Sequence, residues 1–89
     1  MTLQRAVELR NRRGLHARAS AKFVTLASAQ TAEVEVEKDG SSVCGTSIMG
    51  LMMLGAAFGD TVTIRTRGDD AEAALGALVA LVEDKFGED

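Results

Sequence analysis

Tryptophan, tyrosine and proline are absent from the 89-residue sequence, and cysteine and histidine occur once each. The single cysteine, Cys44, cannot form an internal disulfide, which favours a reducing compartment. No segment approaches the ~18 consecutive apolar residues that span a membrane, and the N-terminal segment lacks the apolar stretch of a signal peptide. We therefore expect a cytoplasmic protein that does not insert into membranes.

The same scarcity argues against several kinds of site. One histidine and one cysteine cannot form a closed metal site, and no carboxylate cluster surrounds them, so we expect neither metal nor cofactor. The aromatic residues are three phenylalanines and the net charge is −3, which together disfavour nucleic-acid binding. A hydrolase using Ser20 or Cys44 with His16 fits the spacing but lacks a Gly-x-Ser-x-Gly sequence.

Hydrophobic residues make up 46% of the sequence, enough for one domain over residues 1–89 and too few for a second core. Their periodicity predicts strands over residues 3–9, 32–37, 42–45 and 61–67, and helices over 17–29, 48–54 and 70–86. Ser47 and Asp69 are the predicted caps of the last two helices. The order β-α-β-β-α-β-α predicts an α/β (α+β) fold, a two-layer open-faced β-sandwich. Helices cover one face of its four-stranded, mainly antiparallel sheet.

Positive charge is concentrated near the N-terminus. Residues 1–22 contain six basic side chains and one acidic side chain, whereas the other 67 residues contain four basic and twelve acidic ones. The basic segment also contains His16, the only histidine. On charge alone, this segment fits either a solvated surface or a surface that attracts an acidic partner.

His16 immediately precedes the helix predicted from Ala17. The first backbone N–H groups of a helix, here those of Ala17 and Arg18, have no partner within the helix and carry the positive end of its dipole. They suit a phosphoryl group on His16, and the Arg18 guanidinium adds positive charge. The same dipole favours a neutral imidazole with a nitrogen free to attack phosphorus. Position alone also fits an ordinary exposed capping histidine.

Two motifs extend this interpretation. The segment Gly14–Arg18 resembles the active-site motif of HPr, the histidine-containing phosphocarrier of the bacterial phosphoenolpyruvate-dependent phosphotransferase system. The segment Ser47–Leu54 resembles the second helix of that family, and Ser47 occupies the place of its regulatory serine. The turns at 38–40 and 59–60 also fall where the family has turns, so the resemblance covers essentially the whole chain.

The resemblance implies a phosphocarrier rather than an enzyme in its own right. It implies that His16 accepts a phosphoryl group at Nδ1 from phosphorylated enzyme I and donates it to EIIA-type domains, with Arg18 steadying the group. In members that have an HPr kinase/phosphorylase, phosphorylation at the position of Ser47 weakens this transfer. The alternative is a regulatory module of the nitrogen-related branch that acts by phosphorylation-dependent docking. We expect a monomer.

Partner docking is expected beside His16, on the start of the first helix and on the short second helix. The methionines of the short helix suit several partners because their side chains are flexible. The predicted docking residues are Ala19, Lys22, Ile48, Met49 and Met52.

Two residues depart from the family pattern. Ala19 stands where proline is usual, and Arg13 stands where a small polar residue is common. Alanine preserves the first helical turn but makes it less rigid than proline would. Arg13 adds positive charge next to the motif.

Overall fold

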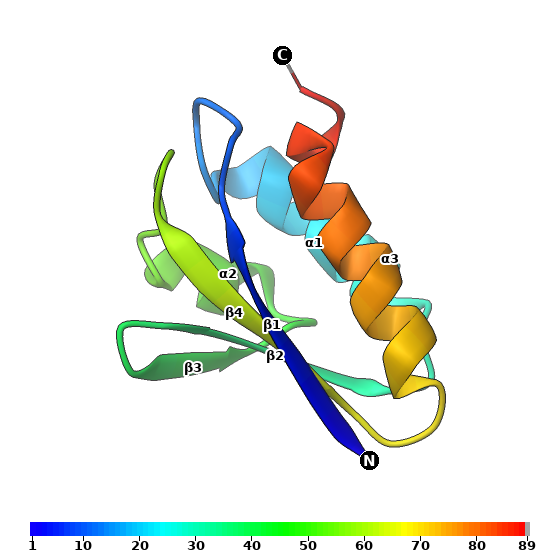
Figure 1. The fold of residues 1–89 in the computed structure, drawn as a ribbon. Coiled ribbons are helices and arrows are strands. Elements are labelled where there is room, and N and C mark those ends of the chain that lie inside the picture. The colour runs from blue at the N-terminus through cyan, green and yellow to red at the C-terminus, as the bar shows by residue number, and fades with distance from the viewer. Residues whose placement is uncertain (89) are drawn as a thin grey trace.

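The computed structural model describes residues 1–88, which form four strands, three α-helices and a short 3₁₀ helix (Figure 1). In chain order these are β1 (Thr2–Glu8), α1 (Ala17–Ser28), β2 (Glu33–Lys38), β3 (Ser41–Cys44), α2 (Ile48–Met53), β4 (Thr61–Arg67), α3 (Ala71–Glu83) and the 3₁₀ helix η1 (Lys85–Gly87). The predicted fold class and element order are therefore confirmed. No helix within residues 1–88 is long and apolar enough to cross a membrane.

The four strands form one sheet in the order β1-β4-β2-β3, and every neighbouring pair is antiparallel. Its register places Val7 opposite Val62 and Val36 opposite Ile64, so apolar side chains line up on one face. Helices α1 and α3 cover this face, as Figure 1 shows, while α2 packs against α1 and the β3 end of the sheet.

The core lies between the sheet and these helices. Its largest fully buried side chains include Phe23 of α1, Ile64 of β4, Leu78 of α3 and Phe86 of η1. In β2 the valines are buried while Glu33 is exposed, the alternation of a strand with one face on the core and one toward solvent.

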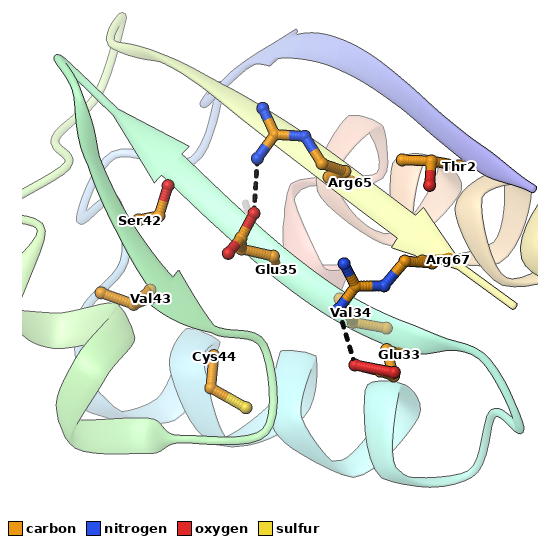
Figure 2. Close-up of a pocket in the computed structure, with 9 residues that line it drawn as sticks. All are labelled: Thr2, Glu33, Val34, Glu35, Ser42, Val43, Cys44, Arg65 and Arg67. Atoms are coloured by element: carbon orange, nitrogen blue, oxygen red, sulfur yellow. Dashed lines mark hydrogen bonds and ion pairs between the residues drawn. The ribbon is translucent and has the colours of Figure 1, made fainter.

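Charged side chains fill the other face of the sheet. Arg65 donates hydrogen bonds to Glu35 and to Glu37 (2.9 Å), and Arg67 donates one to Glu33 (2.8 Å). These hydrogen bonds, that to Glu37 foremost, raise the pKa of Arg65. Figure 2 shows that the cleft which these side chains line opens away from the helices. Its arginines and glutamates are paired with one another, so the cleft is a poor site for a charged ligand.

The two ends of α3 differ from the prediction. Its N-cap is Asp70 in a left-handed conformation (φ 59°) rather than Asp69, and the Asp70 carboxylate accepts a hydrogen bond from Thr31 (3.1 Å) instead of capping the helix. At the other end, α3 stops at Glu83, well before Gly87. The chain then turns through left-handed residues because Phe86, only 1% exposed, is packed into the core.

Candidate functional site

The loop between β1 and α1 is packed tightly against the turn after α2. Gly14 has φ +60°, and a Cβ atom there would lie 2.4 Å from Ala56 O and 2.7 Å from the Cα of Ala57. The next residue, Leu15, donates its backbone N–H to Ala56 O at 3.0 Å. Only glycine combines this conformation with so close an approach, so Gly14 fixes where the following histidine lies.

His16 is the N-cap of α1, as predicted. Its backbone is extended, its side chain makes no capping hydrogen bond, and its carbonyl accepts the first helical hydrogen bond from Ser20 N at 2.9 Å. The N–H groups of Ala17, Arg18 and Ala19 therefore have no acceptor within the helix. These donors and the helix dipole form an anion-binding position at the start of α1.

Arg18 supplies the second predicted feature of the site. Its side chain is exposed, and none of the ion pairs within residues 1–88 involves it. Arg12 and Arg13, in the preceding loop, are exposed as well. The start of α1 thus carries several cations that are available to an anion.

A contact that the sequence did not predict lies on the other side of the ring. The Nε2 atom of His16 is 2.6 Å from a carboxylate oxygen of Glu88, and the two side chains are 17% and 19% exposed. The Asn11 amide donates to the other oxygen of Glu88 (3.1 Å) and to the Gly14 carbonyl (2.8 Å). Burial raises the pKa of Glu88, but the hydrogen bonds from His16 and Asn11, with the charge of Lys22, outweigh it and lower the pKa overall.

The C-terminal turn places Glu88 beside His16. Phe86 is buried in the core, and its carbonyl accepts a hydrogen bond from Lys22 Nζ at 2.7 Å. The predicted docking residue Lys22 therefore also holds this turn in place, although its side chain is exposed. No periodicity or motif connects position 88 with position 16, so this part of the site was not visible in the sequence.

Helix α2 presents apolar side chains to solvent. Its N-cap is Ser47, whose hydroxyl accepts a hydrogen bond from Gly50 N at 2.9 Å, as the cap prediction requires. The α2 patch, as we call its exposed apolar residues, consists of Ile48, Met49, Met52 and Met53, which are 41%, 70%, 43% and 80% exposed. The first three of these are among the residues predicted for docking. Met53 is exposed beside them, and so is Phe58, which is 61% exposed in the turn before β4.

Ala19 was wrongly assigned to the docking surface. Its side chain is completely buried (0% exposed). Ala19, Phe23 and Ala27 lie four residues apart on α1 and form the stripe that faces the core. The residue that replaces the usual proline is thus part of the packing beneath the site rather than of its surface.

Comparisons with known proteins agree with this geometry. A family model described as "PTS HPr component phosphorylation site" matches residues 3–84. The phosphocarrier protein HPr of Cupriavidus necator is 48% identical over 86 residues, which are 97% of each chain. The phosphocarrier protein NPr of Shewanella violacea is 43% identical over 86 residues, or 97% of this chain and 94% of the relative. The crystal structure of HPr-C-His from Thermoanaerobacter tengcongensis has a TM-score of 0.94 at 46% identity and covers 98% of both chains.

The open-faced sandwich with a histidine at the N-cap of its first helix places the chain in the class of small phosphocarrier proteins. Within that class, the chain belongs to the HPr family of the phosphotransferase system.

Proposed function

We propose that this protein accepts a phosphoryl group on His16 from phosphorylated enzyme I and donates it to an EIIA-type domain. The observation that carries the proposal is the placement of His16 at the N-cap of α1. There, three backbone donors and the Arg18 side chain are available to an anion. A solitary exposed thiol at Cys44 supports a reducing, cytoplasmic setting.

The site suits reversible transfer rather than hydrolysis. A ring nitrogen of His16 attacks phosphorus, the bond between phosphorus and the donor's histidine nitrogen breaks, and the group moves without a free intermediate. Nδ1 is the acceptor atom that the family resemblance implies. Hydrogen bonds from Ala17 and Arg18 to the phosphoryl oxygens are worth about 1.5–3 kcal/mol each, enough to hold the group but not to trap it. Arg18 adds charge that stabilises the group during transfer.

The α2 patch and the cations around His16 form the proposed docking surface. Ile48, Met49 and Met52 remain in it, Met53 joins it, and Lys22 contributes from α1. Exposed methionines adapt to partners of different shape, as a carrier with both a donor and an acceptor requires. Transient partners of this kind bury interfaces below about 1,200 Å² in total, so a small apolar patch with a basic rim is enough for docking.

Ser47 is the proposed regulatory site. Its hydroxyl lies at the start of α2, next to the exposed Ile48 and Met49, so a phosphate there would place negative charge within the docking surface. An HPr kinase/phosphorylase is the proposed source of that phosphate. The modification would repel acidic partners and weaken transfer to His16.

A second candidate function is supported by the NPr relative of Shewanella violacea. In that case the chain would serve the nitrogen-related branch, and His16 phosphorylation would control docking rather than sugar uptake. Purified EIIA domains from the two branches distinguish the candidates, because only the correct domain will remove phosphate rapidly from the loaded carrier.

The proposal is tested by measuring intact mass after incubation with phosphoenolpyruvate and enzyme I. We expect the wild-type protein to gain one acid-labile phosphoryl group and the His16→Ala variant to gain none. Arg18→Ala should accept the group about tenfold more slowly while still binding enzyme I, because it loses one charged hydrogen-bond donor. Far-ultraviolet circular dichroism serves as the control for folding. A His16→Ala variant that is folded and still acquires phosphate would contradict the proposal.

A further inference from the structure

We infer that Glu88 is a positioning residue for phosphoryl transfer: its carboxylate holds the proton of His16 on Nε2, leaves Nδ1 free to attack, and balances the charge that the ring acquires. The inference deepens the proposed function and rests on it. It starts from the 2.6 Å contact between His16 Nε2 and Glu88, which comes from a segment 72 residues away in the sequence.

The contact selects one form of the neutral ring. An ionised carboxylate can only accept hydrogen bonds, so the nitrogen that faces it must carry the proton. Glu88 is ionised at neutral pH, since burial raises its pKa but the hydrogen bonds from His16 and Asn11 outweigh burial and lower the pKa overall. The Nε2–H form is therefore favoured, and the lone pair of Nδ1 is directed away from Glu88 and available to phosphorus.

The same contact stabilises the product of transfer. When the Nδ1 lone pair forms the bond to phosphorus, the donor's bond to phosphorus breaks and its electron pair returns to the donor's nitrogen. The His16 ring keeps its Nε2 proton and acquires a positive charge. That charge appears 2.6 Å from the Glu88 carboxylate, which needs no rearrangement to balance it. A carboxylate in catalytic triads orients and stabilises a histidine in the same way.

Asn11 holds the Glu88 carboxylate from the loop before α1. It is completely buried and donates hydrogen bonds to both Gly14 O and Glu88, which fixes the orientation of its amide. Its Oδ1 atom, also buried, has no hydrogen-bond partner within the part of the chain that the structure describes. An unpaired buried acceptor is destabilising. The two hydrogen bonds that the amide donates link the loop before α1 to the Glu88 carboxylate and fix where that carboxylate lies.

The backbone before Glu88 supports the same conclusion. Lys85 and Phe86 adopt left-handed conformations with φ of 58° and 56°, which are unfavourable for side chains other than glycine. Burial of Phe86 and its hydrogen bond from Lys22 maintain this turn, and Gly87 follows with φ 76°. The turn brings the chain back to His16.

Two substitutions separate the roles of Glu88. Glu88→Gln retains an oxygen that accepts the Nε2 hydrogen bond but removes the charge, whereas Glu88→Ala removes both. Glu83→Ala is the matched control, because it removes an exposed carboxylate at the end of α3. Nitrogen-15 NMR reports which ring nitrogen of His16 is protonated, and rapid-quench kinetics with phosphorylated enzyme I report the maximum rate and KM.

We expect a single Nε2–H form in the wild type and in Glu88→Gln, and a mixture of the two forms in Glu88→Ala. The maximum rate should fall about tenfold in both variants with little change in KM, because a charged partner of the ring is lost. Glu83→Ala should match the wild type.

Two results would overturn the inference while leaving the proposed function intact. One is a Glu88→Gln variant that accepts the phosphoryl group at the wild-type maximum rate. The other is a change confined to KM, which would assign Glu88 to docking. Failure of the wild type to accept phosphate would instead overturn the proposed function, and the inference with it.

Discussion

At the scale of single residues, opposing effects set the pKa of Glu88. Partial burial disfavours its charged form, yet hydrogen bonds from His16 and Asn11 and the nearby charge of Lys22 favour it more strongly. The His16 ring that the carboxylate positions is thus one of the groups that favour its charged form. Because its pKa is lower in the folded chain than in the unfolded chain, its charged contacts stabilise the fold at neutral pH. That stabilisation is lost as pH falls through the lowered pKa.

The lowered pKa of Glu88 can be measured by titration. The carboxyl carbon of Glu88, followed by carbon-13 NMR, should titrate with a midpoint below the usual glutamate value of about 4.3. In His16→Ala the midpoint should rise, because the hydrogen bond that lowers it most is gone while partial burial remains. Arg10→Gln is the control, since Arg10 pairs with Glu8 and not with Glu88. An equal midpoint in the wild type and in His16→Ala would show that the contact does not persist in solution.

Single residues differed in how far the sequence could predict them. A local pattern placed His16 at the start of a helix, whereas its proposed role and that of Arg18 came from the resemblance of residues 14–18 to the HPr motif. Ala19 was misplaced because its burial depends on which side of α1 faces the sheet, a property of the packed structure. Asn11 and Glu88 were missed because their significance arises only when the loop after β1 meets the turn after α3 in the folded chain.

At the scale of elements, α2 is short and depends on its first residue. Six residues form few helical hydrogen bonds, so the contact from Gly50 N to the Ser47 hydroxyl is a substantial part of what holds the first turn. The same hydroxyl is the proposed phosphorylation site. Capping and regulation therefore compete for one oxygen atom.

Substitution separates these two roles. Ser47→Ala should lower the free energy of unfolding by about 1 kcal/mol through loss of the cap. Ser47→Asp should retain most of the stability, because aspartate caps helices well, and yet slow phosphoryl acceptance by adding negative charge. Urea unfolding followed by circular dichroism measures the first effect, and rapid-quench kinetics measure the second. Ser41→Ala, an exposed serine of β3, is the control.

If both Ser47 variants lost stability equally and transferred phosphate equally, the serine would have only a structural role. Similar acceptance rates in Ser47→Asp and the wild type would remove it as a switch.

Strands and helices were predictable where the hydrophobic residues follow a single periodicity. Alternation of valine and glutamate in β2 defines both its conformation and its buried face. The start of α3 was mispredicted because Asp69 and Asp70 are adjacent. The capping pattern indicates Asp69, whereas the N-cap is Asp70, whose carboxylate contacts Thr31. The first residue of such a helix depends on hydrogen bonds to residues that are distant in the sequence, and a local sequence pattern carries no information about those bonds.

At the scale of the whole molecule, charge is divided between two regions. Six of the ten basic side chains lie within residues 1–22, four of them in the loop just before His16 or on α1 (Arg12, Arg13, Arg18 and Lys22), whereas acidic groups dominate the rest of the chain. On the open face of the sheet, Arg65 and Arg67 are neutralised by β2 glutamates. The molecule therefore presents its available positive charge mainly beside His16.

Transfer should consequently depend on ionic strength. At low carrier concentration, raising salt from 50 to 500 mM is expected to slow phosphoryl acceptance about fivefold, because screening weakens electrostatic attraction to an acidic partner. At saturating concentration the rate should change little. The double substitution Arg12→Gln with Arg13→Gln should reduce the salt dependence, whereas Arg67→Gln on the open face should preserve it. Equal salt dependence in all three proteins would argue against steering by the loop.

The arrangement of the strands was only partly predictable. Hydrophobic patterns identify four strands and the face that each buries, but the order β1-β4-β2-β3 depends on pairings between distant segments. One such pairing joins β1 to β4, which are separated in the sequence by two helices and a hairpin. The edges of the sheet follow from these pairings and are not encoded in any one segment.

The start of β1 and the end of η1 lie at opposite ends of the molecule, and η1 lies at the same end as the loop that leads to His16 (Figure 1). An affinity tag or fluorophore joined to Met1 is therefore remote from the phosphoryl acceptor. The same label at the carboxyl end follows closely on Glu88, the residue in contact with the His16 ring. Proteins purified through a C-terminal tag are expected to report an altered carrier, so kinetic comparisons should use amino-terminal labels or none.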